Sequence, residues 1–180
     1  MANHTTWNVL NVFIASPGDL AEERRVAREV VSELNRIVGL ELSWHIELLG
    51  SEDTLPGYSR PQDIINKYVD ECDLFIGLLW RKWGQPTGTG EYTSGFEEEF
   101  ERARKRCERT GSPEIWLCFK QVEPMQAEDA GEHLKRILAF RQSQVALKQA
   151  YFKEFLNPED WRTKLHEWLL RYILRLAKPL

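Results

Sequence analysis

Apolar residues along the chain fall into short runs that alternate with longer stretches of helical periodicity. Residues 9–15, 73–80 and 115–119 have the β-branched and aromatic composition of buried strands. The run at 73–80 is almost continuously apolar, which is typical of a central strand covered on both faces of a parallel sheet. Residues 40–49 also have strand composition, and residues 151–156 fit a short edge strand. The pattern therefore predicts five strands.

Amphipathic helices are expected between these strands. Over residues 20–38 the apolar positions recur at helical spacing, and Gly39 follows as an end signal. In the last helix, Asn157 and Pro158 suit the N-cap and the first helical position. Pro61 opens another helix in the same way. Besides residues 20–38, helical patterns lie at residues 61–72, 94–109, 132–149 and 157–177. Loops are expected at 50–59 and 81–93, and an irregular segment is expected at 122–129.

Strands and helices that alternate in this order predict one α/β domain with a parallel sheet and helices on both of its faces. Such connections are right-handed, and ligands bind at the carboxyl ends of the strands. The loops that follow Ala15, Leu49 and Trp80 should therefore meet at one edge. With 180 residues and 42% hydrophobic content, the chain suits a single domain with one sizeable core.

Composition excludes several classes of function. The net charge is -4, and Lys and Arg are mixed with Asp and Glu, so no basic surface is expected for nucleic acid. Cys72, Cys107 and Cys118 form no close pair, which indicates a reducing compartment. No signal peptide precedes the first strand, and no apolar run approaches the ~20 residues of a membrane span. We expect a cytoplasmic protein that does not enter a membrane.

Metal sites and hydrolase triads have no support in the sequence. The four histidines are dispersed and show no paired spacing, and no Cys/His cluster exists. The GxSxG motif is absent as well. We therefore expect no metal and no bound cofactor.

The segment from Ser94 to Phe100 is the most informative. Ser94 and Glu97 have the spacing of a capping box, and acidic residues are favourable in a first helical turn, so Glu97 needs no further role. Glu99 lies on the flank of the apolar stripe that Phe96 and Phe100 begin, whereas Glu97 and Glu98 turn away from it. A carboxylate aimed at the sheet edge can bond a ribose or act on a glycosidic bond, or it can simply complement the helix dipole.

Two further loops carry candidate binding residues. After the first strand, Ser16, Pro17, Gly18 and Asp19 can offer a hydroxyl and backbone N–H groups to a phosphate, although Asp19 equally suits a helix N-cap. After the central strand, aromatic and cationic side chains stand next to a glycine and suit ring stacking, or they belong to the core. These residues are Trp80, Arg81, Lys82, Trp83 and Gly84.

Several segments together resemble a TIR-like domain of unknown function found at the N-terminus of STAND or NLR-like proteins. The segments are 12–20 with 22–24, 60–63, 72–77, 83–84 and 94–95 before the glutamates. In that family the domain precedes NACHT-type ATPase, tetratricopeptide or WD-repeat regions, including those of bacterial anti-phage defence proteins. The resemblance covers roughly residues 8–175 and implies that residues 1–180 are the N-terminal domain of a longer protein.

The resemblance implies a three-layer, flavodoxin-like fold with about five strands. It also implies a signalling or effector role, in which self-association and downstream NACHT or repeat domains bring copies together. Related TIR domains cleave NAD with a glutamate that matches Glu99, and Gly95 matches a glycine of the Gly-Thr-x-x-Glu pattern of nucleoside deoxyribosyltransferases. Phe96 departs from the threonine of that pattern.

Three functions follow as alternatives. The first is an NAD glycohydrolase with Glu99 as the catalytic residue and NAD as substrate rather than cofactor. Its nucleotide would contact Ser16, Pro17, Gly18, Asp19, Trp80, Trp83, Gly84, Ser94 and Gly95. The second is a non-catalytic adaptor that self-associates or recruits a partner, and the third is a deoxyribosyltransferase-like enzyme.

Overall fold

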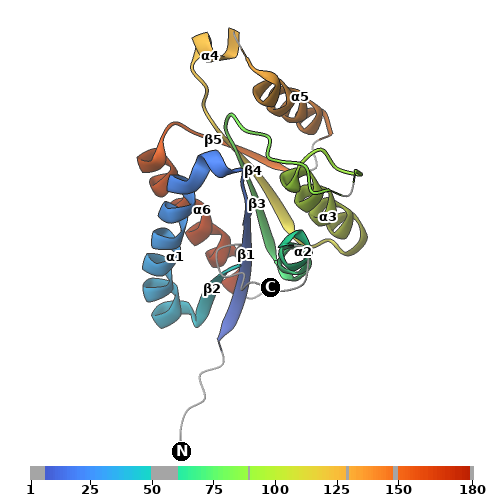
Figure 1. Cartoon of the computed structure of the whole chain (residues 1–180). Helices are drawn as coiled ribbons and strands as arrows, with labels where there is room; N and C mark the ends of the chain where they lie inside the picture. The colour runs from blue at the N-terminus through green and yellow to red at the C-terminus, as the bar shows by residue number, and fades with distance from the viewer. Residues whose placement is uncertain (1–6, 50–60, 89, 129, 148–149, 179–180) are drawn as a thin grey trace, which may run out of the picture.

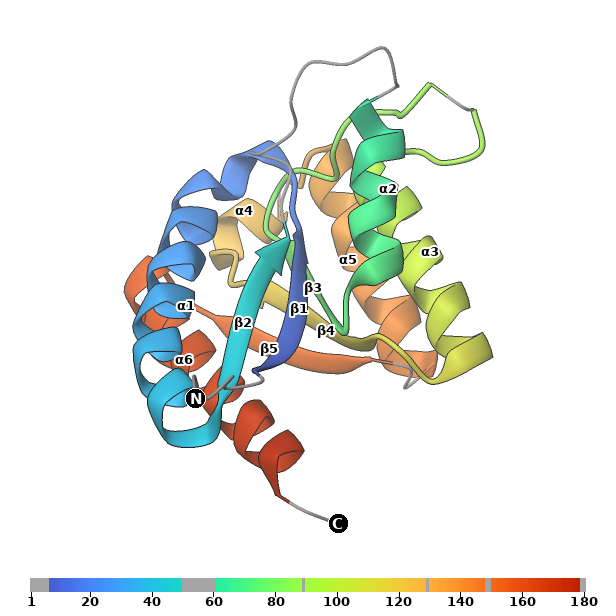
Figure 2. The ribbon, with the colours of Figure 1, turned by 90° about the horizontal axis from the view of Figure 1, so that it is seen from below.

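A five-stranded parallel sheet forms the centre of the protein in its computed structural model, with strand order β2-β1-β3-β4-β5. The structure describes residues 7–49, 61–88, 90–128, 130–147 and 150–178. Helices α1 and α6 cover one face of the sheet, and α2, α3 and α5 lie on the other side (Figures 1 and 2). This is the three-layer, flavodoxin-like α/β fold that the sequence predicts.

The strands are β1 (Asn8–Ala15), β2 (Trp44–Leu49), β3 (Leu74–Leu79), β4 (Glu114–Lys120) and β5 (Tyr151–Phe155). The helices are the 3-10 turn η1 (Gly18–Leu20), α1 (Ala21–Leu42), α2 (Pro61–Glu71), α3 (Gly95–Thr110), α4 (Pro124–Glu128), α5 (Glu132–Leu147) and α6 (Pro158–Ala177). The predicted loop at residues 50–59 lies outside the described residues.

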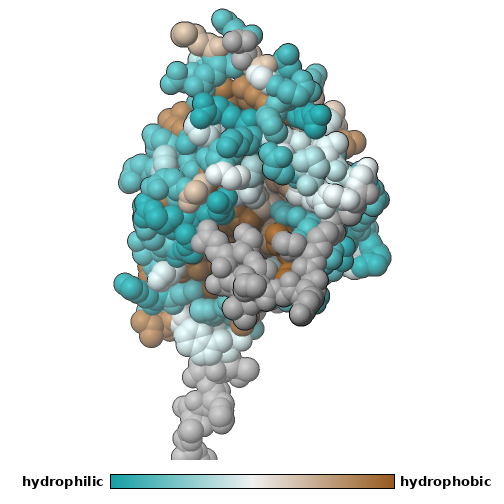
Figure 3. All heavy atoms as spheres, in the orientation of Figure 1, coloured by the Kyte–Doolittle hydropathy of each residue, from teal (hydrophilic) through white to brown (hydrophobic). Residues whose placement is uncertain are grey.

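Each face of the sheet carries its own apolar core. Between the sheet and α1 and α6, side chains such as Val12, Ile76 and Leu165 are fully buried. On the opposite face, Phe75 and Phe100 pack in a second cluster with residues of α2, α3 and α5. All six residues of β3 are buried, because this strand lies between β1 and β4 and is covered on both faces. The surface seen in Figure 3 is mostly hydrophilic, with separate apolar areas.

Three predictions about the elements are wrong: the end of the first helix, the start of the second strand, which begins at Trp44 rather than at residue 40, and the irregular segment at 122–129. Helix α1 continues through Gly39 to Leu42 and ends at Ser43, which adopts the left-handed conformation with φ 55°. A Cβ on Gly39 would stand 2.6 Å from the Trp7 ring, so this glycine inside the helix makes room for the indole rather than marking the helix end. The short helix α4 forms where we expected irregular chain. By contrast, Asn157 caps α6 as predicted, and its side chain accepts from the Asp160 N–H at 3.0 Å.

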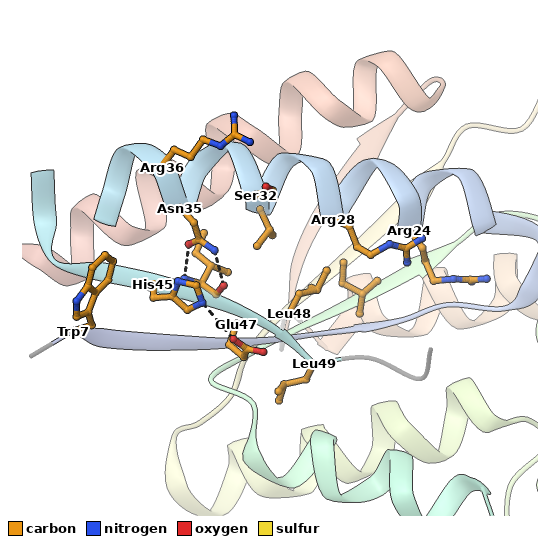
Figure 4. Close-up of a pocket in the computed structure, with 13 residues that line it drawn as sticks. Trp7, Arg24, Arg28, Ser32, Asn35, Arg36, His45, Glu47, Leu48 and Leu49 are labelled. Carbon is orange, nitrogen blue, oxygen red and sulfur yellow. Dashed lines mark hydrogen bonds and ion pairs between the residues drawn. The ribbon is translucent and has the colours of Figure 1, made fainter. Parts of the chain in front are cut away.

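A side-chain amide from α1 closes part of the outer edge of β2. The Asn35 amide nitrogen donates to the Ile46 carbonyl at 2.9 Å, and the Ile46 N–H donates to the Asn35 carbonyl oxygen at 2.7 Å (Figure 4). Asn35 thus satisfies the two backbone groups of Ile46 that a neighbouring strand would otherwise bond.

Asn35→Ala should lower the free energy of unfolding by about 1–3 kcal/mol, since it leaves two backbone groups without their partner. Urea denaturation followed by circular dichroism measures this. Ser32→Ala is the control, because Ser32 lies about one turn away from Asn35 on α1. An equal loss in both variants would contradict the role of the amide.

Candidate active site

A cavity of about 380 Å³ lies where the carboxyl ends of β1 and β3 meet the start of α3. In a parallel α/β sheet this edge is the usual place for a ligand. The cavity draws its lining from the turn after β1, the loop after β3, the first turns of α3 and the start of α5. These residues are Ser16, Pro17, Gly18, Lys82, Gly84, Gln85, Gly95, Phe96, Glu99 and His133.

The start of α3 is held by the predicted cap. The Ser94 hydroxyl accepts from the Glu97 N–H at 3.1 Å, and the Glu97 carboxylate reaches back to the N–H and hydroxyl of Thr93. The Gly95 N–H donates to the Gln85 carbonyl at 3.0 Å, which joins the helix to the preceding loop. Gly84 has φ 101°, and a Cβ there would stand 3.2 Å from the Ser94 Cβ, so both conformation and space favour glycine.

Glu99 is the carboxylate of this cavity, and it is only 8% exposed. Its Oε1 accepts from the Gln62 side-chain amide of α2 at 3.0 Å. Burial raises the pKa of the Glu99 carboxyl to about 7, the Gln62 hydrogen bond opposes this, and the nearby Glu98 charge adds to it. Within the described part of the chain Glu99 forms no salt bridge. It is therefore a buried acid that can hold or release a proton near neutral pH.

Glu98 is buried, although helical periodicity places it off the apolar stripe of α3. Glu98 is 6% exposed and accepts from the Asn66 amide of α2 at 2.8 Å. Gln62 and Asn66 are four residues apart on α2, and the Gln62 amide also donates to Asn66 at 3.4 Å. One face of α2 thus presents two amides to the two adjacent carboxylates of α3. Helical periodicity could not show this, because α2 buries the polar flank of α3.

Asp19 connects two loops rather than capping a helix. Its Oδ2 accepts from the Arg81 and Lys82 N–H groups at 3.0 and 2.9 Å, and the turn that begins at Gly18 has no side-chain cap. The N-cap interpretation is therefore wrong. Nearby, the Arg24 guanidinium donates to the Ser16 hydroxyl at 2.8 Å. These bonds set the positions of the loops after β1 and β3 at the cavity.

The two candidate stacking tryptophans are held elsewhere. Trp83 is 4% exposed, packs on Phe96 and Phe140, and donates from its indole to Thr93 at 2.7 Å. Trp80 packs against the core on the α1 and α6 side. Neither ring lines the cavity, and neither do Asp19 or Ser94. Of the candidate residues, the structure gathers Ser16, Pro17, Gly18, Gly84, Gly95 and Glu99 there.

An ion pair between Lys120 and Glu23 lies against the Trp80 ring. The Lys120 ammonium lies 2.7 Å from the Glu23 carboxylate, whose side chain is 2% exposed, and 4.1 Å from the Trp80 ring centre. The Arg81 guanidinium lies 3.8 Å from the same ring. The start of the loop after β3 is thereby joined to α1 and β4.

Lys120→Met should lower the free energy of unfolding by about 3–5 kcal/mol, because it leaves Glu23 buried without a counter-charge. Urea denaturation measures the loss. Lys120→Met combined with Glu23→Gln should recover part of it, and equal stability of the single and double variants would rule out the ion pair as the cause.

Sequence reasoning missed three residues around the cavity, namely His133, Gln85 and Gln62. His133 lies at the start of α5, and its Nδ1 accepts from the Trp83 N–H at 3.3 Å. Lys82 and Gln85 come from the loop after β3, and Gln62 bonds Glu99 from α2. Lys82 was itself among the candidate residues of its loop, and Gln62 lies in one of the segments that carry the family resemblance. Nothing in the sequence around His133 indicates that α5 reaches this edge.

A larger cavity of about 640 Å³ runs along α1 and β2. Figure 4 shows its side chains, among them Arg24, Arg28, His45 and Glu47. His45 and Glu47 lie 3.3 Å apart and both are exposed, so water screens their charges. We assign the candidate active site to the smaller cavity because it contains a buried acid at the carboxyl ends of the strands.

Two classes of feature are not found within the described ranges. No group of three or more His, Cys, Asp or Glu side chains is placed to hold a metal ion there. No helix in the described part of the chain combines the length and apolar character that crossing a bilayer requires.

Comparison with known proteins places the sequence in a family. Two crystal structures of translation elongation factor SelB from Methanococcus maripaludis are similar in fold. The complex with the GTP analogue GppNHp has a TM-score of 0.51 and 16% sequence identity, and the match covers 98% of this chain and 36% of that chain. The apo form has a TM-score of 0.49 and 18% sequence identity, and the match covers 97% of this chain and 34% of that chain. This chain thus spans about a third of their length. No curated protein matches it. The model of the family described as domain of unknown function DUF4062 matches residues 11–169, and the chain belongs to this family.

Proposed function

We propose that this domain is a signalling or effector module whose Glu99 cavity cleaves the N-glycosidic bond of NAD or a related nucleotide. The observation that supports it is a single buried acid, Glu99, in a cavity at the carboxyl edge of the sheet. Its pKa is raised to about 7, and its described partner is the neutral amide of Gln62. A carboxylate placed in this way has no cationic partner among the described residues, and a positively charged substrate could take that place.

The chemistry of NAD fits such a group. The pyridinium carries a positive charge next to C1′ of the ribose, which favours the ionised form of Glu99. When the bond between C1′ and the ring nitrogen breaks, its electron pair goes to nicotinamide, which leaves as a neutral molecule. Positive charge then develops on the sugar, and the carboxylate stabilises it by charge or by covalent attack. Water then adds to C1′, which breaks the bond between C1′ and the carboxylate where one has formed, and its proton passes to the carboxylate or to solvent, which completes the hydrolysis.

The resemblance to TIR-like domains of STAND and NLR-like proteins supports the wider context. In this proposal residues 1–180 form the N-terminal effector domain of a longer defence protein. Its downstream NACHT or repeat domains would sense a trigger and assemble copies, which activates the N-terminal domains. A non-catalytic adaptor would use the same assembly but would not need an acid in a cavity.

The test is turnover of NAD by the domain at high concentration or fused to an oligomeric scaffold, with products separated by chromatography. We expect release of nicotinamide and ADP-ribose. A folded, clustered domain that releases no nicotinamide would contradict the catalytic proposal and favour the adaptor.

A further inference from the structure

Lys82 and His133 occupy the same cavity as Glu99 but have no assigned role. Both are exposed, whereas Glu99 is buried. The cavity therefore has a solvent-facing part that carries a cation and an imidazole, and an interior that carries the acid. Such a cavity suits a ligand whose anionic end stays near solvent at the mouth while its other end enters the interior.

A backbone hydrogen bond holds the His133 ring against the loop that carries Lys82. The Lys82 N–H donates to Asp19, and the next N–H, that of Trp83, donates to His133 Nδ1 at 3.3 Å. Because Nδ1 accepts this bond, the proton of the neutral imidazole resides on Nε2. His133 thus has an N–H donor available on the ring atom that the backbone does not use.

The positive charge of Lys82 is not balanced by a carboxylate in the described part of the chain. No described carboxylate forms an ion pair with its ammonium, and the acid in the cavity, Glu99, is bonded to Gln62. Arg81, the neighbouring cation, stacks on Trp80 and does not line the cavity. Among the described residues that line the cavity, Lys82 is the one with a permanent positive charge.

We propose that Lys82 and His133 Nε2 form a phosphate subsite at the mouth of the cavity, which selects a nucleotide over the corresponding nucleoside. This inference rests on the proposed function, because it assigns a binding site to the phosphates of the same substrate whose glycosidic bond lies at Glu99. An ammonium and an N–H donor close together are the usual partners of a phosphate oxygen. The Ser16 hydroxyl lines the same cavity and bonds Arg24.

Binding of inorganic pyrophosphate tests the subsite without requiring turnover. Isothermal titration calorimetry at low salt should show that Lys82→Met weakens binding about tenfold or more, as expected for a lost charged hydrogen bond. Lys135→Met is the matched control, because Lys135 is exposed on α5 and does not line the cavity. His133→Asn, whose amide oxygen can still accept from the Trp83 N–H, should weaken binding as well.

The outcomes separate this inference from the proposed function. Pyrophosphate that fails to bind the wild type, or that binds Lys82→Met and Lys135→Met equally, would overturn the phosphate subsite. Glu99→Gln should keep pyrophosphate binding. If it also kept NAD turnover, the catalytic proposal would fail while the subsite stood. For an active enzyme, Lys82→Met should reduce the preference for NAD over nicotinamide riboside, which contains the same glycosidic bond without phosphates.

Discussion

Glu99→Gln should abolish NAD turnover, with a loss of about a thousandfold or more, while the fold remains intact. The substitution removes the negative charge that stabilises the developing cation, and removal of one preorganised electrostatic group from an active site typically lowers turnover by ~10²–10³. The amide oxygen of the new side chain can still accept the hydrogen bond from Gln62. Nicotinamide release by the clustered domain, measured by chromatography, checks the loss.

A neighbouring glutamate provides the control for this experiment. Glu97 lies in the same helical turn, and its carboxylate bonds Thr93 outside the cavity. Glu97→Gln keeps an acceptor for Thr93 and should retain turnover. Equal activity of Glu99→Gln and the wild type would exclude Glu99 as the catalytic group, and an equal loss in both variants would indicate a general effect on α3.

Stability should depend on pH through the same carboxyl group. In the folded protein its pKa is raised to about 7 from the ordinary 4.5. Between these two values the folded state therefore holds a proton that the unfolded state has lost. Stability contributed by this site falls as pH rises through that interval and is constant above it. The size of the loss is on the order of 3 kcal/mol.

Comparison of the wild type with Glu99→Gln isolates this dependence. Below about pH 4.5 the difference in free energy of unfolding between them should be independent of pH. Toward pH 8 the wild type should lose on the order of 3 kcal/mol relative to the variant, because glutamine does not ionise. Urea denaturation at several pH values measures the difference. A difference that stays constant from pH 4 to pH 8 would show that Glu99 ionises as an ordinary carboxyl.

Local patterns in the sequence predicted much of the fold. The apolar run of β3 has the composition of a strand buried on both faces, and all six residues of β3 are buried. The Ser94 cap and the Asn157 cap are formed as their spacing predicts. The flank position of Glu99 on α3 also follows from helical periodicity, and the structure buries this carboxyl.

Contacts between distant segments escaped the sequence. Gly39 reads as a helix end, but the Trp7 ring packs against it and the helix continues. For Trp83 the sequence left both ring stacking at the rim and a place in the core open, and only the packing of Phe96 and Phe140 around it decides for the core. Asp19 suits an N-cap, yet the loop after β3 brings it two N–H donors from 62 and 63 residues away.

The sequence by itself determined the strands and the helices other than α4, where α3 and α6 begin, and that Glu99 lies on the flank of the apolar stripe of α3. These properties depend on residues within one or two helical turns of each other, so spacing is enough to specify them. Only the tertiary structure decided that α2 covers Glu98, that Gln62 bonds Glu99, and that α5 brings His133 to the cavity. Each of these depends on how separate helices pack on the sheet, and no local pattern records that packing.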